Sequence, residues 1–204
     1  MVINIKNIGI ILRNFEENNK KFIGSRKDLF ERLFLYNVNI IGIPIGNNFE
    51  NIKVLVDMCD GIILSGGDNF LDNDFLLIDY LYKNDIPTLG LCLGMQGMYR
   101  YFSKIEEENI NNHFSEDKYV HYINIKQDSL LFKIIGKDRI LVNSRHKSGF
   151  IEDNFLVSAL SDDGIIESIE DKTKKFFLGV EWHPESIKDK YSKKIFDYFI
   201  NVLK

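Results

Sequence analysis

The sequence has few cysteines, no long apolar run and no excess of positive charge. Its 204 residues include two cysteines, Cys59 and Cys92, which are too few for a disulfide framework and lack the spacing of metal ligands. We therefore expect a reducing, cytoplasmic environment and no metal site. No apolar run reaches the length of a transmembrane helix, and residues 1–15 lack the features of a signal peptide, so no membrane attachment is expected.

The net charge of the chain also argues against polyanionic partners. A net charge of −4 gives no general attraction to nucleic acid or to an anionic membrane, although it permits a local basic pocket for a small anion. Hydrophobic residues make up 45% of the chain and include 16 Phe and 9 Tyr, which is enough apolar surface for a core. The length fits one domain, and no repeat or linker divides residues 1–204.

In the first half of the chain, short apolar runs alternate with segments of helical spacing. The expected strands are 8–13, 39–46, 61–67 and 87–94, and the expected helices are 25–37 (with Ser25 as N-cap), 51–60, 72–85 and 95–102. This alternation, without two-residue hairpin turns, predicts a parallel sheet covered by helices on both faces.

The pattern changes from about His121 onward. Four strand-like segments separated by polar turns precede a final amphipathic helix; the segments are 119–126, 138–149, 155–170 and 175–182, and the helix is 186–204. The whole pattern predicts one α/β domain with a mostly parallel sheet and a small antiparallel annex in its second half.

A cysteine flanked by glycines stands at the end of the fourth expected strand. The pattern Gly90-Leu91-Cys92-Leu93-Gly94 is a cysteine version of the nucleophile elbow, a strained strand-to-helix turn with no room for neighbouring side chains. The turn lifts the sulfur above the sheet, and the first helical N–H groups favour its thiolate form. The alternative is a small buried residue in a glycine-rich turn, which explains a lone cysteine between glycines about as often.

Two further segments supply what a nucleophilic cysteine needs. His183 follows the expected strand 175–182 and, if the chain is extended there, Glu185 points to the same side and orients the imidazole. The turn at Gly66 and Gly67 can add a backbone N–H to that of Leu93 to stabilise an oxyanion. Each segment alone is better explained as a core histidine or an ordinary turn. Together they lie at the carboxyl ends of expected strands, where open α/β sheets bind ligands, and this favours a catalytic site.

Three segments together resemble the class I glutamine amidotransferases, and in particular their gamma-glutamyl hydrolase-like branch. They are GIILSGGD (61–68), PTLGLCLGMQGM (87–98) and GVEWHPES (179–186), and the segments ILVNSRHKSGF (140–150) and DDGIIESIE (162–170) are similar to the part of the branch between nucleophile and histidine. The resemblance covers residues 9–186. It implies a flavodoxin-like sheet, no metal or organic cofactor, and a triad of Cys92, His183 and Glu185.

The resemblance also assigns the surroundings of the triad. It implies an oxyanion hole made by the backbone N–H groups of Gly67 and Leu93. By the same resemblance, Gln96 lies beside the bound glutamyl group. The residues assigned to substrate binding are Gly66, Gln96, Asn143, Ser144, Arg145 and His146. Two other histidines match no catalytic motif, and we expect His113 in a loop and His121 in a strand.

Two departures from the branch bear on the substrate. The helix at Asp74 follows Gly67 almost directly, without the long substrate loop common in related hydrolases, which suggests an open acceptor side. Arg145 stands where many relatives have an uncharged residue. Its guanidinium suits a carboxylate or phosphate, although a solvent-facing charge or an ion-pair partner explains it equally well.

One activity within the branch is the hydrolysis of gamma-glutamyl-CDP-amidate to glutamate and cytidine diphosphoramidate, a step in bacterial capsule phosphoramidate synthesis, and we expect this activity here. The alternatives are hydrolysis of gamma-glutamyl-gamma-aminobutyrate, a glutaminase subunit that passes ammonia to a separate synthetase, and a regulatory binding protein, against which the intact triad argues. The expected partners are a small gamma-glutamyl substrate, nucleotide-linked or not, and at most a second copy of the chain in a homodimer.

Overall fold

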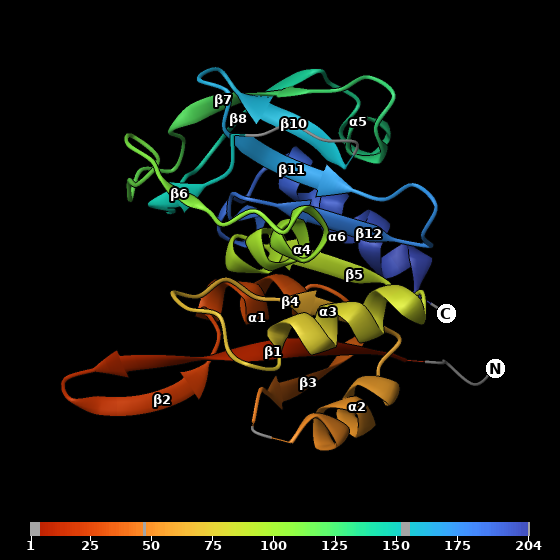
Figure 1. Cartoon of the computed structure of the whole chain (residues 1–204). Helices are drawn as coiled ribbons and strands as arrows, with labels where there is room; N and C mark the ends of the chain where they lie inside the picture. Colours follow the sequence, from red (N-terminus) through yellow and green to blue (C-terminus); the bar gives the residue numbers. More distant parts are fainter. Residues whose placement is uncertain (1–4, 47, 152–155, 204) are drawn as a thin grey trace.

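The chain folds around one large mixed sheet (Figure 1). The computed structural model describes residues 5–46, 48–151 and 156–203. The strand order is β2-β1-β4-β5-β12-β11-β10-β7-β8, β3 pairs with the first part of β1, and a separate small sheet joins β6 to β9. The strands are β1 (Lys6–Glu17), β2 (Lys20–Gly24), β3 (Val38–Pro44), β4 (Gly61–Leu64), β5 (Thr88–Leu91), β6 (Glu108–Asn109), β7 (His121–Ile125), β8 (Arg139–Val142), β9 (Ser148–Gly149), β10 (Val157–Ser161), β11 (Ile166–Glu170) and β12 (Phe177–Val180).

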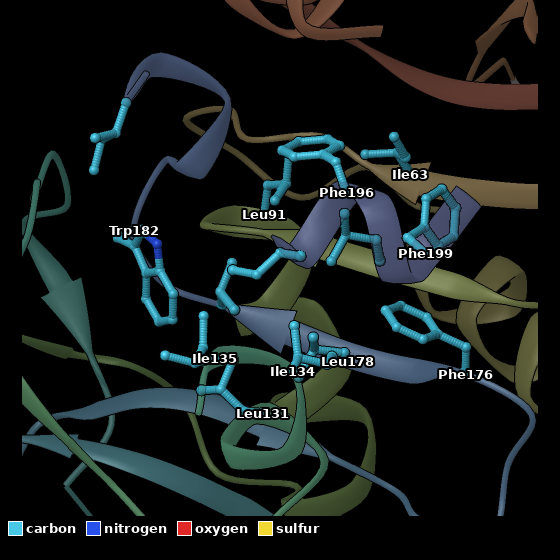
Figure 2. Packing of buried hydrophobic residues seen from close by; sticks show 14 of the residues in the cluster. Ile63, Leu91, Leu131, Ile134, Ile135, Phe176, Leu178, Trp182, Phe196 and Phe199 are labelled. Carbon is cyan, nitrogen blue, oxygen red and sulfur yellow. The ribbon is translucent and has the colours of Figure 1, made fainter. Parts of the chain in front are cut away.

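Helices cover both faces of this sheet. They are α1 (Lys27–Leu33), α2 (Phe49–Asp57), α3 (Asp74–Lys83), α4 (Leu93–Ser103), α5 (Leu130–Ile135) and α6 (Lys190–Val202), with a 3-10 turn η1 (Pro184–Ser186). Buried side chains of α1, α5 and α6 pack on one face, and those of α2, α3 and α4 pack on the other. Figure 2 shows the first of these layers, in which Phe196 and Phe199 of α6 lie over the strands. Each such buried side chain contributes roughly 1.5–3 kcal/mol.

The central strands of the sheet are parallel. β3, β1, β4, β5 and β12 are paired in parallel, and β11, β10, β7 and β8 extend the sheet as an antiparallel annex. Because neighbouring parallel strands end at the same edge, the loops that follow β4, β5 and β12 open side by side. The expected α/β class and its antiparallel second half are confirmed.

The first strand is longer than the sequence predicted. β1 continues past Arg13 and pairs with β2 through a two-residue turn at Asn18 and Asn19, whose φ values are 52° and 60°. Both turn residues lie in the left-handed region, which Asn tolerates better than most residues. The assumption that two-residue hairpins are absent was therefore wrong. Residues 14–23 are exposed throughout, so no apolar alternation marks this hairpin.

Smaller differences concern the ends of elements. The N-cap of α1 is Arg26, without a side-chain capping bond, so the predicted cap at Ser25 is wrong. Helix α5 falls in a stretch for which no helix was predicted. Residue 155 of the expected segment 155–170 and residue 204 of the final helix lie outside the described residues. Within the described ranges, no helix is long and apolar enough to cross a membrane.

Candidate active site

Cys92 lies where β5 ends and α4 begins. Its backbone has φ 48° and ψ −109°, a combination that residues with a side chain rarely adopt and that stores strain. A Cβ on Gly94 would lie 2.1 Å from the backbone oxygen of Leu64, and one on Gly90 would lie 2.4 Å from the sulfur of Met98. These close approaches explain why both positions are glycine, and the backbone has the geometry of the predicted elbow.

The surroundings of the sulfur hold it as a thiol. Burial raises the pKa of the Cys92 thiol well above its ordinary value, and the negative charge of Glu181 raises it further. A hydrogen bond from the Leu93 N–H lowers the pKa and is outweighed. The helix N-terminus therefore does not by itself produce the thiolate that the sequence suggested. A neighbouring base has to take the proton when the sulfur reacts.

A histidine next to a carboxylate follows β12. His183 Nδ1 lies 2.7 Å from Glu185 Oε1, and both side chains are almost fully buried. The chain between them does not meet the condition of being extended, because η1 turns there and brings the carboxylate back onto the imidazole. A Cβ on Gly66 would lie 3.1 Å from His183 Cε1 and 3.6 Å from Cys92 Cβ. The imidazole and the cysteine therefore flank the same glycine, and the carboxylate orients the ring.

Asn143 and Ser144 support this arrangement from inside the protein. Asn143 accepts a hydrogen bond from the His183 N–H at 2.8 Å and donates one to the His183 carbonyl at 3.0 Å. Ser144 donates to the carbonyl of His113 at 2.5 Å. Both side chains are fully buried, so they hold neighbouring segments in place. Both side chains have a positioning role in this structure, and their predicted contact with substrate stays a prediction.

An ion pair that the sequence did not reveal holds the glycine turn after β4. Arg13 Nη1 lies 2.6 and 2.7 Å from the two carboxylate oxygens of Asp74, and both side chains are buried. Arg13 also donates to the carbonyl of Ser65, and Asp74 accepts the Leu71 N–H. A Cβ on Gly67 would lie 2.9 Å from Arg13 Cγ. The pair thus fixes both ends of the turn that was predicted to supply an oxyanion N–H.

Gln96 projects from the first turn of α4 and is oriented by the protein. Its Nε2 donates to Glu181 Oε1 at 2.6 Å and to the carbonyl of Ser148 at 3.1 Å. Both amide hydrogens are used in these bonds, so the side-chain oxygen is the group that can serve a substrate.

Two cavities meet at Cys92. The smaller, of about 280 Å³, extends past Gln96 to His146, and the larger, of about 430 Å³, extends past His183 to Arg26. The walls that they share are Gly67, Asp68, Cys92, Phe114 and Arg145. The predicted site residues found in one or both walls are Gly66, Gly67, Cys92, Leu93, Gln96, Arg145, His146 and His183.

Arg145 lies in the wall of both cavities and is only 12% exposed. Its Nη1 donates to Ser186 Oγ at 2.9 Å, and its Nε lies 3.7 Å from the exposed carboxylate of Glu116. Such a pair with an exposed carboxylate is weak, and Nε completes no hydrogen bond within the described residues. The interpretation of Arg145 as a solvent-facing charge is therefore wrong, and its guanidinium faces the site.

Comparisons with known proteins show what the chain is similar to. The model of the family Peptidase C26 matches residues 72–185. A glutamine amidotransferase-type protein of Schizosaccharomyces pombe is 34% identical over 175 residues, covering 70% of this chain and 69% of that protein. One subunit of the glutamine-hydrolysing GMP synthase of Methanothrix thermoacetophila is 27% identical, covering 95% of this chain and 97% of that protein.

A solved structure shows the same fold. The glutaminase domain of the Trypanosoma brucei CTP synthase, with bound acivicin, superposes with a TM-score of 0.71 at 18% identity. The superposition covers 97% of this chain and 93% of that one.

Proposed function

The chain belongs to the Peptidase C26 family of class I glutamine amidotransferase-like proteins, and from that premise we propose that it is a cysteine-dependent hydrolase of gamma-glutamyl amide bonds. The observation that carries the proposal is the strained Cys92 beside the His183–Glu185 pair, with cavities opening on both sides of the sulfur. A nucleophile, a base and an orienting carboxylate in this order are the components of acyl transfer through a covalent intermediate.

The reaction follows from these positions. His183 takes the thiol proton of Cys92 as the sulfur attacks the gamma-carbonyl carbon, and the backbone N–H groups of Leu93 and Gly67 stabilise the resulting oxyanion. The imidazolium, held by Glu185, gives its proton to the departing nitrogen as the C–N bond breaks, which leaves a gamma-glutamyl thioester. Water then attacks the thioester, and His183 accepts a water proton and passes it to the sulfur as glutamate leaves.

The positions of His183 and Gln96 support separate cavities for the two halves of the substrate. The group that protonates the leaving nitrogen has to face the leaving group, and His183 lines the larger cavity. The larger cavity is therefore the leaving-group side. The smaller cavity, with Gln96 in its wall, then receives the glutamyl group.

The leaving-group cavity supports a nucleotide-linked substrate. Arg26 and Arg145 line it together with the rings of Phe15 and Phe114. Guanidinium groups bind phosphates, and aromatic rings stack on bases, whereas the leaving group aminobutyrate offers one carboxylate. We therefore favour gamma-glutamyl-CDP-amidate, hydrolysed to glutamate and cytidine diphosphoramidate, the product used in capsule phosphoramidate synthesis.

The first experiment follows glutamate release by the purified chain from three substrates: gamma-glutamyl-CDP-amidate, gamma-glutamyl-gamma-aminobutyrate and glutamine. Cys92→Ala serves as the blank. We expect fast turnover of the nucleotide amidate and little of the other two. A preference for the aminobutyrate compound would refute the nucleotide assignment, and substantial release by Cys92→Ala would refute the mechanism itself.

The leaving-group side is tested by Arg145→Ala. If the guanidinium binds the diphosphate, kcat/KM for the nucleotide amidate falls about 10- to 100-fold, which is the range for a lost charge-assisted hydrogen bond. The value for glutamine, whose leaving group is ammonia, changes much less. Arg139→Ala is the matched control, because this exposed arginine pairs with Asp162 away from the cavities. Equal losses on both substrates would place Arg145 on the glutamyl side instead.

A glutaminase that serves a synthetase is the second candidate. The similarity to the GMP synthase chain of Methanothrix thermoacetophila, over nearly the full length of both chains, favours it. In that case the larger cavity would carry ammonia toward a synthetase partner. Slow glutamate release from all three substrates, with an intact thiol at Cys92, would favour this second role.

A further inference from the structure

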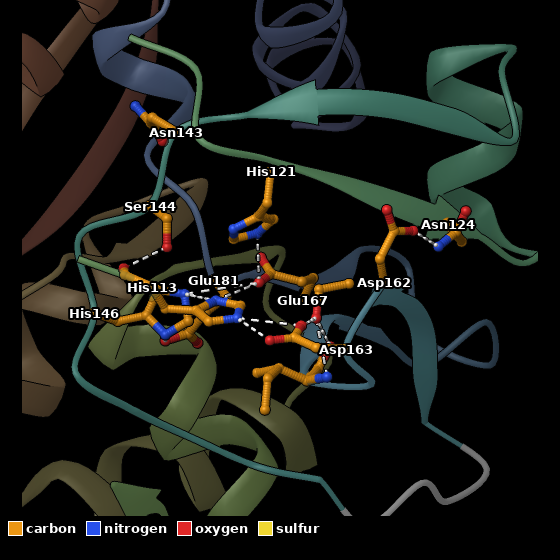
Figure 3. Close-up of polar contacts among 12 residues, drawn as sticks. His113, His121, Asn124, Asn143, Ser144, His146, Asp162, Asp163, Glu167 and Glu181 are labelled. Atoms are coloured by element: carbon orange, nitrogen blue, oxygen red, sulfur yellow. Dashed lines mark hydrogen bonds and ion pairs between the residues drawn. The ribbon is translucent and has the colours of Figure 1, made fainter. Parts of the chain in front are cut away.

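Figure 3 shows a cluster of histidines and carboxylates, one of which, His146, lines the smaller cavity. His113 comes from the stretch before β7, His121 from the start of β7, His146 from the segment after β8, and Glu167 from β11. Glu167 is fully buried, and His113 and His146 are nearly so. The mechanism above uses none of these four side chains in a proton transfer.

Three imidazole nitrogens surround one carboxylate oxygen. Glu167 Oε1 lies 2.8 Å from His121 Nε2, 3.4 Å from His113 Nδ1 and 3.7 Å from His146 Nε2. His113 Nδ1 lies 3.3 Å from His146 Nε2. The ligand atoms of a tetrahedral zinc ion, at about 2.0–2.1 Å from the metal, lie about 3.3 Å from one another. These four separations are close to those between the ligand atoms of such an ion, and the ligand atoms of His113, His121 and Glu167 all lie within 4.8 Å of one another.

The outer contacts determine which nitrogens carry hydrogen. His146 Nδ1 lies 3.0 Å from the carbonyl oxygen of Ser148, which can only accept, so Nδ1 carries the hydrogen. His113 Nε2 lies 3.1 Å from the carboxylate of Asp163 and carries its hydrogen for the same reason. In their neutral form, the form in which imidazole binds a metal, both rings direct a lone pair into the cluster, toward the carboxylate of Glu167. Acceptors that converge in a buried place need a cation between them.

The hydrogen-bond angles lead to the same conclusion. Within the described residues, neither carboxylate oxygen of Glu167 and neither ring nitrogen of His121 completes a hydrogen bond, despite the short distances. Short separations with poor angles arise when groups point at a common centre rather than at one another. A proton on one ring would satisfy one of these contacts, whereas one metal ion satisfies all of them.

We propose that His113, His121 and Glu167 form a binding site for one divalent transition-metal ion, with Zn²⁺ as the best match and His146 lying beside them. Imidazole nitrogens with a carboxylate oxygen are a ligand set that zinc accepts. Metal-bound histidines commonly donate their second nitrogen to a carboxylate or to a backbone carbonyl, and two rings of this cluster do so. The sequence did not suggest the site, because its members are too far apart to form a spacing motif.

The position of the proposed metal site next to the smaller cavity indicates a structural role, in which the ion supports the cavity wall. His113 belongs to the irregular stretch between α4 and β7, and its neighbour Phe114 lines both cavities. His146 Nδ1 also lies 3.2 Å from Glu181, the carboxylate that orients Gln96. The ion would thus fasten this stretch to β11 and keep the wall of the glutamyl cavity in place.

The first test is a titration of the whole protein, stripped with a chelator and dialysed, with Co²⁺ and then with Zn²⁺. We expect one equivalent of Co²⁺ per chain, a visible absorption spectrum of tetrahedral nitrogen and oxygen ligation, and its loss when Zn²⁺ displaces Co²⁺. The titration is repeated after alkylation of Cys92, because Cys92 and His183 could themselves hold a metal. No stoichiometric binding, or binding that alkylation abolishes, would overturn the proposal.

Two adjacent aspartates provide a matched pair of variants. Asp163 supports His113, whereas Asp162 pairs with the exposed Arg139. Asp163→Asn should weaken Zn²⁺ binding about 10- to 100-fold, the usual cost of losing a carboxylate behind a metal-bound histidine, and Asp162→Asn should leave it unchanged. Glu167→Gln should lose stoichiometric binding, with circular dichroism to check its fold. Unchanged affinity in Asp163→Asn would instead identify the cluster as a buried network of imidazolium and carboxylate groups.

Discussion

Cys92 combines a strained backbone with a thiol whose pKa is raised. The positive φ at Cys92 turns the chain sharply into α4, while burial and the charge of Glu181 keep the pKa of the thiol high. Alkylating agents and oxidants attack the thiolate and not the thiol. We therefore expect the resting protein to react slowly with such reagents, and in the proposed mechanism the sulfur becomes nucleophilic when His183 accepts its proton.

This predicts how the thiol responds to pH. Because the pKa of Cys92 is raised, the thiolate fraction is small at neutral pH and grows as the pH rises, so alkylation by iodoacetamide should accelerate from about pH 7 to about pH 10 without levelling off near neutrality. The groups around the sulfur that bear on this are Glu181, Glu185, Glu167 and His183.

Peptide mass spectrometry measures that rate separately at each cysteine. Cys59 is an internal control, since burial raises its pKa to about 11. A rate at Cys92 that is already maximal near pH 7 would show a thiolate in the resting protein and contradict the prediction.

Among the elements, the turn between β4 and α3 depends on one buried ion pair. Asp74→Asn would leave the guanidinium of Arg13 buried without its counter-charge, which typically costs about 3–5 kcal/mol in the free energy of unfolding. The freed turn would also displace the N–H of Gly67, so kcat should fall more than KM rises. Urea unfolding and steady-state kinetics measure the two effects.

The neighbouring Asp72 supplies the control for this prediction. Its side chain is exposed, so Asp72→Asn should change the free energy of unfolding by less than about 1 kcal/mol. If Asp74→Asn were as stable and as active as Asp72→Asn, the pair would not be what holds the turn.

The elements that the sequence predicted well are those with a clear repeat or a steric requirement. β4 and β5 are short runs of buried apolar residues, and the glycines around Cys92 reflect close contacts that only glycine permits. The sequence did not predict the hairpin of β1 and β2, because both its faces are exposed. It did not predict η1, because a single turn has no repeating pattern. The burial of Arg13 depends on Asp74, 61 residues away, and no local pattern records such a pairing.

The candidate site was predictable to a similar extent. Cys92, His183 and Gln96 all line the two cavities. They could be predicted because each stands in a motif at the end of a strand or in the first helical turn after it. Asn143 and Ser144 follow β8 in the same way but are turned into the protein. Position at a strand end predicts which edge of the sheet a residue occupies, while the direction of its side chain depends on the packing of segments distant in sequence.

At the scale of the whole molecule, one sheet connects the two halves of the chain. β12 pairs in parallel with β5 on one side and antiparallel with β11 on the other, so the annex cannot separate without exposing a central strand. We expect a single cooperative unfolding transition, as for one domain. Trp182, the one tryptophan of the sequence and fully buried, reports on this centre, and its fluorescence should change together with the far-ultraviolet circular dichroism. Two separated transitions would indicate two domains.

The exposed hairpin of β1 and β2 lies apart from the strands that carry the chemistry. Phe15, on this hairpin, and Arg26, just beyond it, line the larger cavity, which we propose receives the leaving group, whereas Cys92 and His183 follow β5 and β12. On the proposed assignment of the cavities, part of the leaving-group side thus belongs to a stretch of chain separate from the nucleophile and the base. Lengthening, shortening or exchanging the hairpin offers a way to redesign the accepted leaving group while the catalytic centre stays intact.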